Sequence, residues 1–192
     1  MRFRAVVLAS ALAFSLSASA ELITNGGFET ADFTGWNVNA GATFVTSNQS
    51  GYLPNSGSYF AALGNVFGLG TLSQTFADTP GATYTLSYYL ASNGTSPNEF
   101  RVDVGSTTLF DQVDIAATGG YIFYSFQFTG TGSDTLTIYE RDDPSYLALD
   151  DVSVTAATSN AVPEPQSILL LGTGLLGLAG AARRRFAHAI PR

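Results

Sequence analysis

The sequence predicts an all-β protein, an antiparallel β-sandwich of jelly-roll type, and three observations support this prediction. Short segments alternate between apolar and polar residues with a period of two, which is the signature of half-buried antiparallel strands. Clusters of Gly, Pro, Asn and Ser, which favour turns, separate these segments. No stretch between residues 21 and 162 has helical periodicity. Roughly eight to ten short strands at this spacing favour a jelly roll over a meander barrel.

The clearest alternation runs over residues 83–90, where Tyr84, Leu86, Tyr88 and Leu90 share one face. Because successive side chains of a strand point to opposite faces, we expect these four residues to face the core. The same pattern recurs over residues 100–104, 122–128, 136–138 and 152–154. Together these strands place one sandwich domain at residues 21–155.

The first twenty residues are typical of a signal peptide. Residues 1–4 carry two arginines, residues 5–16 are apolar, and residues 18–20 form an A-x-A cleavage site before Glu21. An N-terminal anchor helix is the alternative, but it would need a longer apolar run. We therefore expect residues 1–20 to direct export and to be removed.

The composition changes after residue 155. Residues 156–162 form a small, polar linker, and residues 163–192 form a tail with an apolar segment at 168–182 followed by three arginines. A helix over that segment is about 22 Å long, shorter than a usual span of ~20 residues. Arginines held on the cytoplasmic side extend its effective length, so we expect a single C-terminal membrane helix. A buried helix of the domain is the alternative.

The tail has three elements in a diagnostic order: a Pro-Glu-Pro, an apolar segment and an arginine cluster. The residues are Pro163, Glu164, Pro165, Arg183, Arg184 and Arg185. They resemble the PEP-CTERM sorting signal of Gram-negative bacteria. The resemblance implies recognition by an exosortase-type membrane protease and an association with exopolysaccharide and biofilm matrix. It implies export through the inner membrane, transient anchoring, and a final place at the cell surface or outside the cell.

Charge and composition exclude several classes of function. Residues 21–162 contain fourteen acidic residues but only two basic ones, Arg101 and Arg141, and no His, Cys or Lys. So acidic a surface repels nucleic acid and anionic lipid, and it favours cations and neutral, hydroxyl-rich ligands. Without His, Cys or Lys the domain cannot build the usual catalytic triads or zinc sites. We predict that it is not an enzyme. A secreted glycoside hydrolase with two catalytic carboxylates is the remaining enzymatic alternative.

Five short segments of the domain resemble the galactose-binding-like jelly-roll carbohydrate-binding modules. They cover residues 22–29, 35–36, 56–59, 84–87 and 149–154. The resemblance implies that Glu29 and Asp150 help to hold a structural calcium ion. Strand alternation independently places Asp150 on the inward face with Val152 and Val154, where a carboxylate needs a partner. A hard cation supplies one; a turn cap or an arginine pair is the alternative.

A second acidic run, residues 140–143, is interpreted as a solvated loop, with a weaker cation site as the alternative. Trp36 is expected to anchor the core. The candidate glycan-binding aromatics are Tyr89, Tyr121 and Phe123, which occupy outward strand positions or flank a turn.

The function expected from the sequence is that of an exported, non-enzymatic surface or extracellular-matrix protein that binds glycan and is stabilised by calcium. A purely structural or adhesive biofilm protein without a small-ligand site is the main alternative.

Overall fold

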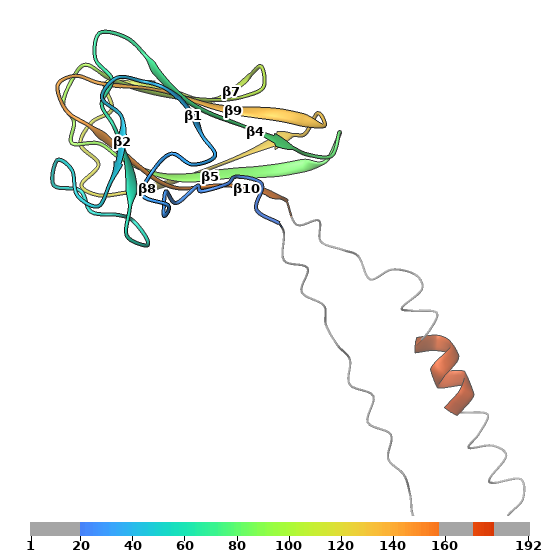
Figure 1. Ribbon diagram of the computed structural model, residues 1–192. Helices are drawn as coiled ribbons and strands as arrows, with labels where there is room; N and C mark the ends of the chain where they lie inside the picture. The colour runs from blue at the N-terminus through green and yellow to red at the C-terminus, as the bar shows by residue number, and fades with distance from the viewer. Residues whose placement is uncertain (1–19, 158–170, 179–192) are drawn as a thin grey trace, which may run out of the picture. The chain divides into compact units, whose positions relative to one another are not determined.

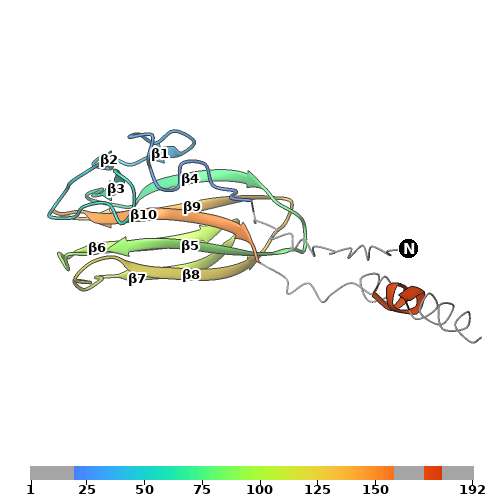
Figure 2. The ribbon, with the colours of Figure 1, turned by 90° about the horizontal axis from the view of Figure 1, so that it is seen from below.

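The computed structural model describes residues 20–157 and 171–178, and the chain divides into two units, residues 1–157 and 158–192. In the first unit, ten antiparallel strands form two facing five-stranded sheets, which confirms the predicted sandwich (Figures 1 and 2). The strands are β1 (Asn37–Asn39), β2 (Phe44–Thr46), β3 (Phe60–Leu63), β4 (Gly70–Ala77), β5 (Thr83–Ala91), β6 (Asn98–Val104), β7 (Thr107–Val113), β8 (Ile122–Thr129), β9 (Ser133–Asp142) and β10 (Leu147–Ala156).

The first sheet has the strand order β1-β4-β9-β6-β7, and the second has the order β2-β3-β10-β5-β8. Neighbours along the chain often lie in different sheets: β4 and β5 do, and so do β9 and β10. The chain therefore crosses repeatedly between the layers, as it does in a jelly roll. Each sheet has one face in the shared core and one outer face.

The core is made by the alternating apolar faces that the sequence predicts. Tyr84, Leu86, Tyr88 and Leu90 of β5 are all buried, and the ring of Tyr88 stacks on that of Tyr124 at a centroid distance of 5.4 Å. The other sheet contributes Phe100, Val102, Leu136 and Ile138. Among the described residues, every member of this cluster lies between residues 22 and 154, and residues 1–157 form one compact unit, so we expect a fragment of residues 21–157 to fold without the tail.

The segment before β1 closes one side of the core. Trp36 is buried as predicted, packs against Phe28 at 5.9 Å, and donates its indole N–H to the carbonyl of Asn25. The side-chain amide of Asn25 in turn donates to the carbonyls of Asp32 and Thr34. This loop is thus held by the core on one side and by its own polar groups on the other.

The prediction that Asp150 faces the core is wrong, although the residue is fully buried. The register between β10 and β5 shifts between Asp150 and Ser153, and Asp151 has a φ of 51°. This β-bulge inserts one extra residue, so that Leu149 and Val152 both enter the core. Asp150 pairs with Tyr89 and therefore lies on the outer face of the second sheet, where a loop covers it.

Of the tail, only the helix at residues 171–178 is described, within the predicted apolar segment 168–182. Residues 1–19 of the predicted signal peptide, most of the predicted linker, the Pro-Glu-Pro and the arginine cluster lie outside the described residues. Among the residues that are described, no helix is long and apolar enough to span a membrane.

Candidate functional site

The outer face of the second sheet carries a pair of aromatic rings, one exposed and one half-buried. Tyr89 of β5 and Phe123 of β8 occupy directly paired positions, and their ring centroids lie 5.1 Å apart. The side chain of Phe123 is 55% exposed. Strand alternation sends Tyr89 away from the core because its neighbours Tyr88 and Leu90 fill it, and Phe123 shares that face as its direct cross-strand partner. Two of the three predicted glycan-binding aromatics therefore form one solvent-facing surface.

Rows of hydroxyl and amide side chains continue this surface along the same two strands. Ser87 pairs with Ser125, and Thr85 pairs with Gln127. All four share the outer face with Tyr89 and Phe123, and all are at least partly exposed. We call these six residues, Tyr89, Phe123, Ser87, Ser125, Thr85 and Gln127, the outer platform. Its combination of ring faces and small polar groups suits a ligand that has both apolar faces and hydroxyl groups.

The third predicted aromatic, Tyr121, borders the platform but is largely covered. Its ring lies 6.2 Å from that of Tyr52, and both pack against a second, smaller buried cluster of Phe60, Ala62, Ala91 and Ala148. Burial, with the nearby charges of Asp150 and Asp151, raises the pKa of Tyr121. Tyr121 therefore supports the loop that covers one end of this sheet and offers little free ring surface.

Two exposed aromatics outside the predicted set also lie in or beside loops. Phe44 of β2 contacts Tyr146 at 5.4 Å, edge to face. Phe67 lies in the loop after β3 and is 91% exposed, with a φ of 66°, a conformation that bulky residues rarely adopt. Strand periodicity could not reveal Phe67; the glycines at 64, 68 and 70 mark only the loop that presents it.

Three carboxylates hold the loop that covers this end of the second sheet. Asp150 accepts hydrogen bonds from the backbone N–H groups of Asn55 and Ser56. Asp151 accepts from the side chains of the same two residues. Burial and the adjacent charge of Asp151 raise the pKa of Asp150 to about 6, although these N–H groups partly offset the shift.

Glu29 holds the next residues of the same loop. Its carboxylate accepts from the backbone N–H groups of Ser58 and Tyr59 at 2.9–3.0 Å. The two predicted calcium ligands therefore meet the loop at residues 55–59 from different parts of the chain. Within residues 20–157 and 171–178, no group of three or more acidic, His or Cys side chains is arranged to hold a metal. A calcium ion here would need main-chain or hydroxyl oxygens from the loop to complete its shell.

The interpretation of residues 140–143 as a solvated loop is wrong for two of them. Glu140 and Asp142 lie at the end of β9 and are fully buried. They continue the inward face formed by Leu136 and Ile138. The sequence resembled an acidic turn, but the strand extends through Asp142.

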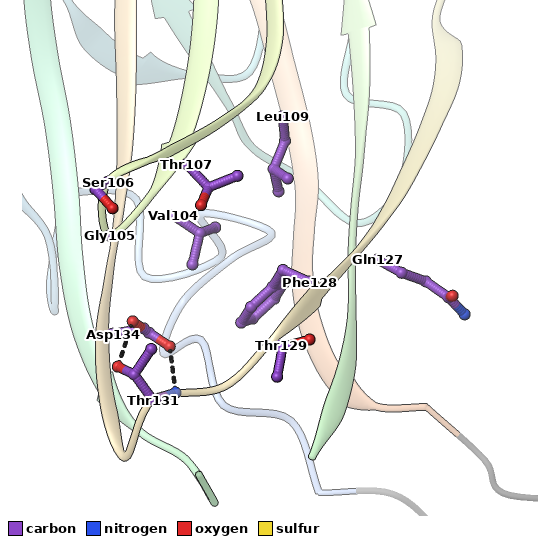
Figure 3. Close-up of a pocket in the computed structure, with 10 residues that line it drawn as sticks. All are labelled: Val104, Gly105, Ser106, Thr107, Leu109, Gln127, Phe128, Thr129, Thr131 and Asp134. Atoms are coloured by element: carbon purple, nitrogen blue, oxygen red, sulfur yellow. Dashed lines mark hydrogen bonds between the residues drawn. The ribbon is translucent and has the colours of Figure 1, made fainter. Parts of the chain in front are cut away.

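A cavity of about 310 Å³ lies at the other end of β9, between the β6–β7 hairpin and the end of β8 (Figure 3). Its apolar wall includes Val104, Leu109 and Phe128. Its carboxylate, Asp134, accepts hydrogen bonds from the hydroxyl and the backbone N–H of Thr131, drawn as dashed lines in Figure 3. The one ring that lines the cavity, Phe128, is 8% exposed. The cavity thus offers less free aromatic surface than the outer platform.

Comparison with known proteins agrees with this architecture, which is that of a β-sandwich with the fold of carbohydrate-binding modules. The structure of TmCBM61 in complex with β-1,4-galactotriose matches with 19% identity and a TM-score of 0.52, over 72% of this chain and 100% of that chain. It also matches the CBM22-1 xylan-binding domain of Paenibacillus barcinonensis Xyn10C, with 17% identity, a TM-score of 0.51 and coverage of 76% and 99%.

The same fold also occurs in proteins of other kinds. A cyclase from Fischerella sp. TAU matches with 18% identity and a TM-score of 0.56, over 74% of this chain and 100% of that chain. A bacteriophage CBA120 tailspike domain also matches, and there the chain covers 21% of that chain's length. The search of curated proteins found no match. Since all these identities are below one fifth, the likeness shows the fold alone.

Two family models match the sequence itself. Residues 20–154 match the family described as protein of unknown function DUF642, and the chain belongs to this family. Residues 161–185 match the PEP-CTERM protein-sorting motif, which confirms the resemblance of the tail. A chain that carries this motif is an exported protein, sorted towards the cell surface and processed by an exosortase.

Proposed function

We propose that the sandwich is a glycan-binding module and that the outer platform is its binding surface. The observation that carries the proposal is the Tyr89–Phe123 pair, with Phe123 exposed and Tyr89 half-buried, on an outer sheet face that rows of hydroxyl and amide groups continue. Pyranose rings have apolar faces that stack on aromatic side chains, while their hydroxyl groups bond to small polar side chains. Both kinds of partner are present on the same two strands.

The charge of the domain narrows the class of glycan. Fourteen acidic residues against two arginines make the domain strongly negative, and a negative field opposes the approach of uronate-rich or sulfated polymers. The platform itself consists of uncharged side chains. We therefore infer a neutral glycan, such as a hexose or pentose polymer, as the ligand class.

The role proposed is binding and not catalysis. Glu140 and Asp142 form an adjacent buried acid pair, but neither has exposed surface through which it could reach a glycosidic bond. Acid catalysis of glycoside hydrolysis needs two carboxyl groups flanking the substrate. Combined with the sorting tail, this favours a surface or matrix protein that attaches cells to exopolysaccharide.

We also propose that calcium stabilises the covering loop, with Glu29 and Asp150 as carboxylate ligands. Support comes from the convergence of the two side chains on residues 55–59 and from the complete burial of Asp150. The loop N–H groups compete with a cation for the same carboxylate oxygens. The E29Q variant of the 21–157 fragment tests this: its calcium-dependent rise in Tm should be smaller than that of the wild-type fragment, and an equal rise would contradict the proposal.

The binding function is tested on the 21–157 fragment with a glycan array and affinity electrophoresis in neutral and anionic polysaccharides. We expect retention by at least one neutral β-linked glycan and none by anionic ones. No retention by any glycan, from a fragment whose Tm shows it to be folded, would leave the purely structural or adhesive role as the better account.

A further inference from the structure

The inward end of β9 holds two carboxylates that lie outside both the outer platform and the covering loop. Glu140 and Asp142 are two residues apart on one strand face, so their side chains point in the same direction. Both residues have an exposed fraction of 0%. Burying one charge without a partner is costly, and burying two like charges side by side is more costly.

Asp142 has no compensating partner in the part of the chain that is described. Neither of its carboxylate oxygens accepts a hydrogen bond, and both are enclosed. Burial, followed by the charges of Glu140 and Asp143, raises the pKa of Asp142 to about 7, and the nearby backbone N–H of Ser145 offsets this only in part.

Glu140 is bonded only to neutral groups. It accepts a hydrogen bond from the hydroxyl of Thr43 at 2.6 Å and another from the backbone N–H of Asn65 at 3.1 Å. Burial raises its pKa as well. These two donors fix the position of the carboxylate but do not neutralise its charge.

The arginines of the sandwich are engaged elsewhere. Arg101 forms a salt bridge of 2.6 Å with Asp103. Arg141 lies between Glu140 and Asp142 in sequence, so it points to the opposite face of β9, where it lies 3.7 Å from Asp143. There is no lysine in the sequence. Neutralisation must therefore come from a proton or from a cation that is not part of the chain.

We propose that Glu140 and Asp142 bind a divalent cation of the calcium type at the end of β9. The oxygens present are those that hard cations prefer: two carboxylates, the hydroxyl of Thr43 and the carbonyl of Asn65, which already accepts the N–H of Asp142. This site is separate from the pair Glu29 and Asp150, and it does not depend on glycan binding.

The cation would connect the end of β9 to the loop after β3, which carries the exposed ring of Phe67. Asn65 lies in the loop that presents Phe67. Burial and, to a smaller extent, the negative charge of Asp142 raise the pKa of Tyr52. The site is also tightly enclosed, because a Cβ on Gly70 would lie 2.6 Å from a Glu140 carboxylate oxygen. Ion binding here thus stiffens the loop after β3.

The test measures binding of Ca²⁺ to the 21–157 fragment by calorimetry and its Tm in EDTA and in CaCl₂. On wild type we expect saturating Ca²⁺ to raise Tm by about 5–10 °C. The D142N and E140Q variants should each bind Ca²⁺ at least tenfold more weakly at this site. In EDTA, D142N should melt at a higher temperature than wild type, because it removes the repulsion between buried charges.

Two control variants distinguish this site from the other acidic groups of the domain. D134N changes a buried acid on the same face of β9 that already has donors; it should lower Tm and leave Ca²⁺ binding unchanged. E29Q changes the other proposed calcium site and should leave Ca²⁺ binding at Glu140 and Asp142 intact.

Three results would overturn the proposal. The first is wild-type Ca²⁺ affinity in both D142N and E140Q. The second is loss of all Ca²⁺ binding in E29Q, which would assign the ion to the covering loop. The third is a wild-type fragment that binds no Ca²⁺ and melts at the same temperature in EDTA, which would mean that a proton neutralises the pair. If D142N does not fold, the Ca²⁺ affinity of E140Q and the number of Ca²⁺ ions bound by E29Q still test the proposed site.

Discussion

The two outer faces of the sandwich differ in how their side chains are used. On the first sheet, the guanidinium of Arg101 covers the ring of Tyr139 at 5.1 Å and is itself paired with Asp103. Thr75 and Thr135 hydrogen bond to one another across β4 and β9. On the second sheet, the exposed ring of Phe123 and the half-buried ring of Tyr89 lie on the same face as Ser87, Ser125, Thr85 and Gln127. On the first face these groups pair with one another, and the second face is the one on which we propose that a ligand binds.

This difference predicts that binding depends on one face only, and the largest effect should come from its rings. The double variant Y89A/F123A should bind the retained glycan about 30-fold or more weakly, because each stacked ring contributes on the order of 1 kcal/mol. Its Tm should fall modestly, because Phe123 is exposed but Tyr89 is half-buried, so Tm confirms only that the variant is folded. Affinity electrophoresis measures the loss, and Y139A is the matched control from the other face. Equal losses in both variants would remove the distinction between the faces.

The loop that covers the closed end of the second sheet should affect stability more than binding. Gly57 has a φ of 62°, and a Cβ there would lie 2.3 Å from a Glu29 carboxylate oxygen. We expect G57A to lower the free energy of unfolding by about 1–3 kcal/mol through strain and displaced hydrogen bonds. Gly51 also has a positive φ, of 84°, but open space around it, so G51A measures the strain alone. Chemical denaturation compares the two, and a G57A cost no larger than that of G51A would contradict the contact with Glu29.

The polar rows should contribute less than the rings. Each hydrogen bond to a neutral ligand contributes about 0.5–1.5 kcal/mol, so S87A and Q127A should each weaken glycan binding by about two- to tenfold. Calorimetry measures this, with T75A on the first sheet as the control. Wild-type affinity in S87A and Q127A alike would place the ligand's hydroxyl groups elsewhere.

The smallest effect on glycan binding is expected from R101A, which tests whether one exposed ring is enough to bind glycan. R101A uncovers Tyr139 but also leaves the buried carboxylate of Asp103 without its two guanidinium hydrogen bonds, so it should lower the free energy of unfolding by about 1–3 kcal/mol. We expect no new glycan binding on the first sheet, since Tyr139 would still lack a second ring beside it. If R101A bound glycan on the first sheet, even when combined with Y89A/F123A, one exposed ring would be enough for glycan binding.

The sequence predicted the fold well because strand alternation and turn residues are local signals. The core set on β5 followed directly from them, whereas the buried Trp36 was expected from its place after Gly35 and from the resemblance to carbohydrate-binding modules. The outward positions of Tyr89 and Phe123 followed in the same way, as the other half of each alternating strand.

What the sequence could not predict depends on register and on long-range contacts. The bulge at Asp151 inverts the phase of β10, so a strict period of two placed Asp150 on the wrong face. The burial of Glu140 and Asp142 depends on β9 continuing between the sheets, whereas an acidic run usually indicates solvent. The partners of Glu29 and Asp150 lie in a loop far along the chain, which no local pattern specifies.

Glycan binding by the outer platform is tested most directly by a map of chemical-shift changes on the 21–157 fragment, titrated with β-1,4-galactotriose and with a xylo-oligosaccharide. We expect at least one of them to shift the ring signals of Tyr89 and Phe123 and the amides of Ser87 and Gln127, and to leave Tyr139 unchanged. Shifts centred on Tyr139, or on Asp134 and Thr131 around the cavity of Figure 3, would contradict binding at the platform.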